Sequence, residues 1–167
     1  TSYIPTSGST VTRAADVASI TGTNFSSWYN QNEGTVFTDI RAIAPQGAYV
    51  AGTISNNTSA NRIYFGANNS FNILVSSGGA IQFSANYYPY SQGQNVKHAA
   101  GLDVNNMSWY VDGTLRGSET TCLMPVGVDR FYLNANETGG QFFSAYLSRL
   151  TYYPERVSDE SLEALTA

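Results

Sequence analysis

The sequence predicts an all-β domain, a two-sheet antiparallel β-sandwich with one short C-terminal helix, on three observations. Clusters of Gly, Asn and Ser recur about every ten residues with short apolar runs between them, which is typical of many strands joined by hairpins. Within the runs the apolar residues alternate, so that Phe71, Ile73 and Val75 share one face of a strand. Charged residues make up only 12% of the chain, and most of its other non-apolar residues are Asn, Ser, Thr and Gly. Sheets with one apolar and one wet face bury the apolar faces by stacking in pairs.

The clusters of Gly, Asn and Ser mark where the expected strands begin and end along the chain. Expected strands lie at 34–44, 48–55, 62–67, 71–77, 80–87, 96–104, 107–111, 131–134 and 141–153. Asn105-Asn106 and Asp112-Gly113 suit two-residue hairpin turns, because both pairs tolerate positive φ. A helix is expected at 158–166, with Ser158 as N-cap and acidic residues in its first turn. Residues 1–12 are expected to form an extended lead-in.

Size and charge limit the classes of protein to which the chain can belong. A chain of 167 residues favours a single domain spanning 1–167. The net charge is -4 and the 8 basic residues are scattered, so no nucleic-acid footprint is expected. No apolar run approaches the roughly 20 residues that a membrane helix needs. Cys122 has no partner for an internal disulfide. Because the chain begins at Thr1 without Met or signal peptide, we expect a module with other domains in a longer parent chain.

Two segments of the last third carry a resemblance to a known family. One is 97–103, followed after a short turn by Trp109-Tyr110-Val111-Asp112-Gly113; the other is 143–153, followed by Val157-Ser158-Asp159-Glu160. Together they resemble concanavalin A-like lectin/glucanase domains of the laminin-G-like type. The resemblance implies a jelly roll of two curved sheets, in which ligands often bind on the concave sheet or at its rim loops.

The opening of the chain resembles a narrower group. Ser2-Tyr3-Ile4-Pro5-Thr6 and residues 12–18 are similar to the version of this domain in bacteriophage and prophage virion proteins, such as tail fibres and spikes. This resemblance implies a virion-associated or extracellular module of a larger phage, prophage or bacterial protein.

The acidic residues argue for binding rather than catalysis. Glycoside hydrolysis needs paired carboxyl groups across the scissile bond, and the glucanases of the resembled superfamily carry an E-x-D-x-x-E strand that this sequence lacks. Its acids are isolated, Glu137 among them, apart from those that begin the terminal helix. The single histidine, His98, is interpreted as a structural residue rather than a member of a catalytic triad, and Cys122 as a small buried hydrophobe. No catalytic residue is therefore expected, and a glycoside hydrolase or lyase is kept as a third hypothesis.

Aromatic and amide side chains form the candidate sugar site. Tyr and Trp rings match the apolar C–H face of a sugar, and Asn, Gln and Arg direct hydrogen bonds to its hydroxyls. The loop after the strand at 80–87 offers Asn86, Tyr87, Tyr88 and Tyr90. The polar faces of neighbouring strands offer Arg62, Tyr64, Gln82 and Tyr110. Cover of the sandwich edge and an ordinary wet face are the respective alternatives.

One turn offers oxygen ligands. Asp103, Asn105 and Asn106 suit calcium chemistry, although turn formation is the commoner role of such residues; no other cofactor is expected. The leading hypothesis is a non-catalytic module that binds a poly- or oligosaccharide. The alternative is a structural or assembly domain of a phage tail or fibre protein without a sugar site.

Overall fold

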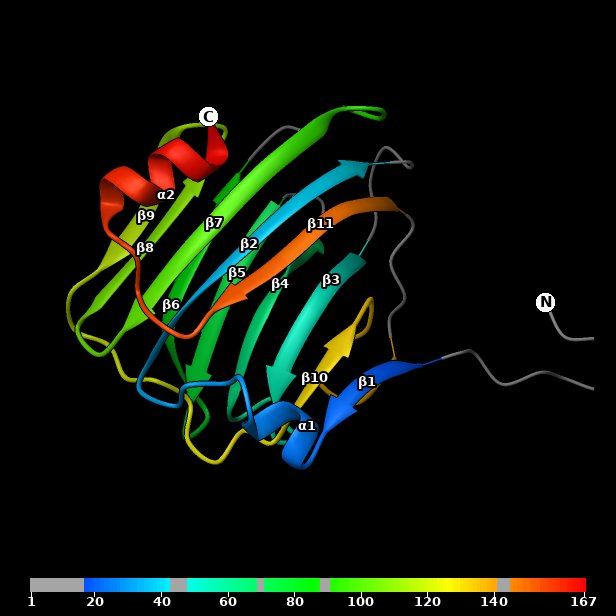
Figure 1. The fold of residues 1–167 in the computed structure, drawn as a ribbon, viewed down its shortest axis with the longest axis vertical. Helices are drawn as coiled ribbons and strands as arrows, with labels where there is room; N and C mark the ends of the chain where they lie inside the picture. Colours follow the sequence, from blue (N-terminus) through cyan, green and yellow to red (C-terminus); the bar gives the residue numbers. More distant parts are fainter. Residues whose placement is uncertain (1–16, 43–47, 69–70, 88–90, 141–144) are drawn as a thin grey trace, which may run out of the picture.

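The computed structural model describes residues 17–42, 48–68, 71–87, 91–140 and 145–167, which form two antiparallel sheets stacked face to face (Figure 1). The six-stranded sheet has the order β1 (Ala18–Thr21), β10 (Arg130–Leu133), β3 (Ala48–Ser55), β4 (Arg62–Asn68), β5 (Phe71–Ser77), β6 (Ala80–Tyr87). The five-stranded sheet has the order β11 (Ala145–Tyr153), β2 (Glu33–Ala42), β7 (Asn95–Asp103), β8 (Asn106–Val111), β9 (Thr114–Glu119). The predicted all-β, two-sheet sandwich is confirmed. None of the described helices is long and apolar enough to cross a membrane.

Three elements of the structure were not predicted from the sequence. β1 is exposed along its whole length, and β9 has no buried residue, so neither shows the alternation that marks a strand. The helix α1 (Thr23–Ser26) is a single turn and is too short to show a helical period. The predicted Asp112-Gly113 turn is confirmed, and both residues have positive φ. The other turn lies one residue earlier than predicted, at Val104 and Asn105, because Asn106 already pairs with Asp103 as the first residue of β8.

The core lies between the sheets. Trp109, Phe65, Ile73 and Ile40 are all less than 2% exposed and come from both sheets. At one end of the sandwich α1 inserts Phe25 into this core, where its ring stacks on Tyr29.

The predicted C-terminal helix is α2 (Asp159–Thr166), and it packs on β7, β8 and β9 of the five-stranded sheet (Figure 1). The Ser158 side chain accepts a hydrogen bond from the Ser161 N–H, as expected of an N-cap. Leu162 is fully buried and packs with Phe37, Ala99 and Tyr110 from the sheet below. The two described helices therefore leave the far face of the six-stranded sheet uncovered, because α1 packs against β1 at its edge.

His98 lies inside the sandwich, on the same side of β7 as Val96, Ala100 and Leu102. It is 2% exposed, and the Trp109 Nε1–H donates to its Nδ1 over 3.3 Å. Nε2 has no hydrogen-bond partner. Burial lowers the pKa of His98 from 6.5 to about 3, because the apolar surroundings disfavour the charged form. This burial agrees with the sequence interpretation of His98 as a structural residue.

The stability of the domain should therefore fall on mild acidification. The folded-state pKa lies below the unfolded value of 6.5, so the unfolded chain binds the proton first as the pH falls. Stability is complete above pH 6.5 and is lost progressively towards pH 3. Between pH 7.5 and pH 5 we expect the free energy of unfolding to drop by about 2 kcal/mol, measured by urea denaturation. His98→Gln, whose side chain can still accept from Trp109, should flatten this dependence; an equally steep slope in that variant would assign the effect to other groups.

Candidate functional site

The far side of the six-stranded sheet, which we call the outer face, carries a row of polar and aromatic side chains. On β4, Ile63 and Phe65 enter the core, so the alternation sends Arg62 and Tyr64 to the outer face. The strand register places Tyr64 between Thr53 of β3 and Leu74 of β5.

A loop at 134–140, directly after β10, folds across the outer face. The Thr53 hydroxyl donates to the Ala135 carbonyl over 3.0 Å, and the Ser55 hydroxyl donates to the Glu137 carbonyl over 3.4 Å. Within the loop, Asn136 Oδ1 accepts from the Thr138 N–H at 3.1 Å and from the Gly140 N–H at 2.8 Å. These bonds hold the loop against β3 and thereby place Glu137 over β4.

Glu137 and Arg62 form an ion pair on the outer face, at the end of the sheet where β4 begins. Arg62 Nη1 lies 2.6 Å from Glu137 Oε2, and the side chains are only 22% and 13% exposed. The Arg62 guanidinium carbon also lies 5.6 Å from the centre of the Tyr64 ring. Burial raises the pKa of Tyr64, with the Glu137 charge adding to the rise and the Arg62 charge opposing it. Ring, cation and carboxylate thus form one connected cluster, which we call the Tyr64 cluster.

Three buried polar atoms of the described outer face lack a hydrogen-bond partner: Nε of Arg62, Oδ1 of Asn72 and Oε2 of Glu137, the last of which is held by its ion pair with Arg62. Asn72 lies one step along β5 from the row of Tyr64, opposite Gly66 on β4 and Asn86 on β6. Buried polar atoms without partners are rare in folded proteins, and each one calls for an explanation. Because these atoms are closed to solvent, a hydroxyl-rich ligand can supply a partner only where the side chain shifts to meet it.

The structure brings together only part of the predicted sugar site. Arg62, Tyr64 and Asn86 share the outer face. Gln82 instead serves the scaffold, because its Oε1 accepts from the Leu123 N–H over 3.0 Å and ties down the loop after β9. Tyr88 and Tyr90 lie outside the described residues.

Two predicted site residues are corrected. Tyr87 ends β6, as the predicted strand at 80–87 requires, but it is not exposed with the following loop: it packs against the core and lies beneath Arg116, with 4.6 Å from the ring centre to the guanidinium carbon. Tyr110 was expected beside Arg62 and Tyr64, but β8 belongs to the five-stranded sheet and α2 covers Tyr110, which is 8% exposed. Alternation showed which residues of β8 share a face, but not which sheet the strand joins.

The candidate calcium ligands form a turn. Asp103 Oδ1 accepts from the Val104 N–H at 2.6 Å, and Asn105 Oδ1 accepts from the Cys122 N–H at 3.1 Å, while Asn106 begins β8. Within the described ranges no group of three or more His, Cys, Asp or Glu side chains could hold a metal ion. These contacts favour turn formation, the alternative role that the sequence offers.

Sequence reasoning missed Glu137 and Asn72. In the sequence Glu137 has no acidic neighbour, and its partner Arg62 is far away along the chain, so no local pattern indicates the pair. The composition of the 134–140 segment indicates a loop, but nothing in it shows that the loop crosses β3. Asn72 could have been found from its alternation with Phe71 and Ile73, which places it on the polar face of β5.

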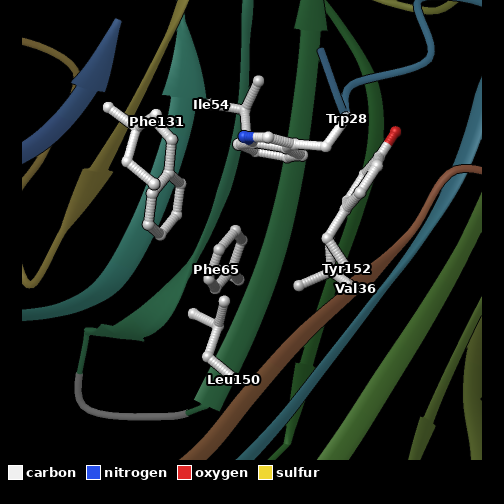
Figure 2. A pocket seen from close by; sticks show the side chains of 8 residues that line it. Trp28, Val36, Ile54, Phe65, Phe131, Leu150 and Tyr152 are labelled. Atoms are coloured by element: carbon white, nitrogen blue, oxygen red, sulfur yellow. The ribbon is translucent and has the colours of Figure 1, made fainter. Parts of the chain in front are cut away.

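A separate apolar pocket of about 220 Å³ lies between the sheets near β10 and β11 (Figure 2). It is lined by Ile20, Trp28, Val36, Ile54, Phe65, Phe131, Leu150 and Tyr152. The lining is almost wholly hydrocarbon, and the Tyr152 hydroxyl is engaged with the carbonyls of Asn30 and Glu33. This pocket offers few partners for sugar hydroxyls and belongs to the core rather than to the candidate site.

Comparison with known proteins establishes the fold. No protein-family model matches the chain, and no curated protein sequence does. Among solved structures, the chain is similar to the CBM40 of the Ruminococcus gnavus IT-sialidase bound to α2,3-sialyllactose, with a TM-score of 0.68 and 15% identity over 83% of this chain and 84% of that one. It is also similar to a K499G mutant of the NanB sialidase from Streptococcus pneumoniae, with a TM-score of 0.68 and 18% identity over 90% of this chain and 27% of that one.

A third similar structure is domain 4 of AbnA, an extracellular GH43 arabinanase from Geobacillus stearothermophilus, in complex with arabinotriose. Its TM-score is 0.64, with 14% identity over 83% of this chain and 68% of that one. At these identities the likeness shows a shared β-sandwich and no more. The concanavalin A-like type and the virion setting remain predictions.

Tyr110 should prove structural. Tyr110→Ala removes a ring packed between β8 and α2, and we expect it to lower the free energy of unfolding by about 3 kcal/mol. Tyr146→Ala is the matched control, since Tyr146 is 65% exposed on β11 and should change stability by less than about 0.5 kcal/mol. Chemical denaturation of both variants measures the difference. Equal stabilities would mean that α2 does not depend on this contact.

Proposed function

We propose that this domain is a non-catalytic carbohydrate-binding module that holds a poly- or oligosaccharide on the outer face of the six-stranded sheet. The observation that carries the proposal is the Tyr64 cluster: a half-buried aromatic ring, a guanidinium and a carboxylate gathered by a loop that is bonded to the strands beneath it.

The chemistry of this face suits a sugar. The ring of Tyr64 supplies a flat apolar surface for the C–H face of a pyranose or furanose. Arg62, Asn72 and Asn86 supply directed donors and acceptors for hydroxyl groups. Their positions are held by strand register rather than by a free loop, so little side-chain and loop ordering is needed on binding. The fold supports the same proposal, because two of the similar structures contain an oligosaccharide.

Binding without cleavage follows from the environment of Glu137. Glu137 is the one carboxylate of the Tyr64 cluster and is paired with Arg62 at 2.6 Å, whereas glycoside hydrolysis uses two carboxyl groups across the scissile bond. We also propose that the module is an extracellular or virion-borne part of a longer chain. The virion setting rests on the resemblance of residues 2–6, which lie outside the described residues.

The proposal predicts measurable glycan binding that depends on the Tyr64 cluster. A glycan array followed by titration calorimetry on the best-bound glycan should yield a dissociation constant that rises at least about tenfold in Tyr64→Ala, because the apolar surface is lost. Arg62→Lys keeps the charge but loses the planar fork, and it should weaken binding in the same direction.

The opposite sheet offers matched controls. Arg149 lies over Phe37, with 5.3 Å from the guanidinium carbon to the ring centre, much as Arg62 lies over Tyr64. Arg149→Lys and Tyr146→Ala should leave the dissociation constant unchanged. Absence of binding across plant, algal, bacterial and animal glycans would contradict the proposal, and so would Tyr64→Ala binding as tightly as the parent chain.

A further inference from the structure

We propose that the glycan bound by the Tyr64 cluster is neutral, and that Glu137 is the residue that selects against acidic sugars. This inference rests on the proposed function and names the ligand class of that same site. It is carried by the charge pairing on the outer face.

Each cation of the described outer face is already matched by a carboxylate. Arg62 on β4 is paired with Glu137 at 2.6 Å. Arg130 on β10, which the register also turns outward, is paired with Asp129 at 2.7 Å. The other described basic residues lie on strands of the five-stranded sheet or in the segment leading to α2: Arg41, Lys97, Arg116, Arg149 and Arg156. Among the described residues, the outer face thus offers no unpaired cation to a sugar carboxylate.

Burial makes the Arg62–Glu137 pair hard to open. A carboxylate ligand would have to displace Glu137 from Arg62 in order to take its place. Because Glu137 is only 13% exposed, it would then be left as a poorly solvated, uncompensated charge. An incoming anion that leaves the pair intact would instead lie close to the Glu137 carboxylate and be repelled by it. The Arg130–Asp129 pair is different, because Asp129 is 56% exposed and water can replace its partner.

A hydroxyl group meets neither obstacle. It carries no charge, so it can contact the partly exposed side chain of Arg62 while the Arg62–Glu137 pair stays closed. It can also donate to the Glu137 carboxylate, which a carboxylate cannot do because it only accepts. Hydroxyls are therefore the groups that satisfy this face without breaking its ion pair.

The first test is a glycan array that contains neutral and acidic members: lactose, arabinotriose and xylohexaose beside α2,3-sialyllactose and trigalacturonic acid. We expect the best-bound glycan to be neutral. Its dissociation constant should change by less than about twofold between about 50 mM and about 500 mM NaCl, because no ligand charge is screened. A best-bound glycan that is acidic would overturn this inference and leave the proposed function standing, whereas absence of any binding would overturn both.

The second test is a change of specificity. Glu137→Gln removes the negative charge, keeps an acceptor for Arg62 and frees its positive charge for a ligand. We expect the ratio of acidic to neutral binding across the same array to rise at least about tenfold. Asp129→Asn is the matched control, since it frees Arg130 on the same face outside the Tyr64 cluster and should leave the ratio unchanged.

Thermal unfolding of both variants checks that each is folded before the ratio is read. An unchanged ratio in folded Glu137→Gln would overturn the assignment of selectivity to Glu137. An equal rise in Asp129→Asn would overturn it as well, because net charge alone would then explain the change. If Glu137→Gln does not fold, the array and salt measurements on the parent chain still decide whether the ligand is neutral.

Discussion

The packing of two apolar sheet faces against each other is the constraint on which the rest of this structure depends. Strand residues alternate between the two faces of a sheet, so burying one set of side chains exposes the other. Once Ile63 and Phe65 enter the core, Arg62 and Tyr64 have to face outward. The candidate site is thus a direct geometric consequence of the core.

The two outward faces of the sandwich differ in what covers them. On the five-stranded sheet the outward residues Phe37, Ala99 and Tyr110 are apolar or aromatic, and α2 buries them with Leu162. On the six-stranded sheet the cover is a polar loop, and its bonds go to the hydroxyls of Thr53 and Ser55. A helix that buries apolar surface adds stability. The loop on the six-stranded sheet instead brings the Glu137 carboxylate to Arg62 and leaves polar groups at the surface. The first face therefore serves the stability of the fold, and the second is available for a ligand.

Two of the described ionisable side chains, His98 and Arg62, are poorly solvated, and their surroundings accommodate them in different ways. His98 lies in the apolar interior without a charged partner, and burial keeps it neutral. Arg62 is instead paired with the Glu137 carboxylate at 2.6 Å. Such pairs contribute little net stability, because removing two charges from water costs about as much as their attraction returns. The pair is therefore better understood through what it does to a ligand than through what it does for the fold.

The sequence by itself determined the class of fold, most strand positions, the hairpin turns at Asn105 and Asp112, and the helix that begins after Ser158. All of these depend on neighbours a few residues apart, where alternation, positive φ and capping leave a local signal. β9 escaped because its exposed residues show no alternation. Only the tertiary structure decided that Tyr110 lies beneath α2, that Tyr87 lies beneath Arg116, and that Glu137 reaches Arg62. These contacts depend on which sheet a strand joins and which face a loop crosses, and both are settled by long-range packing that no local spacing records.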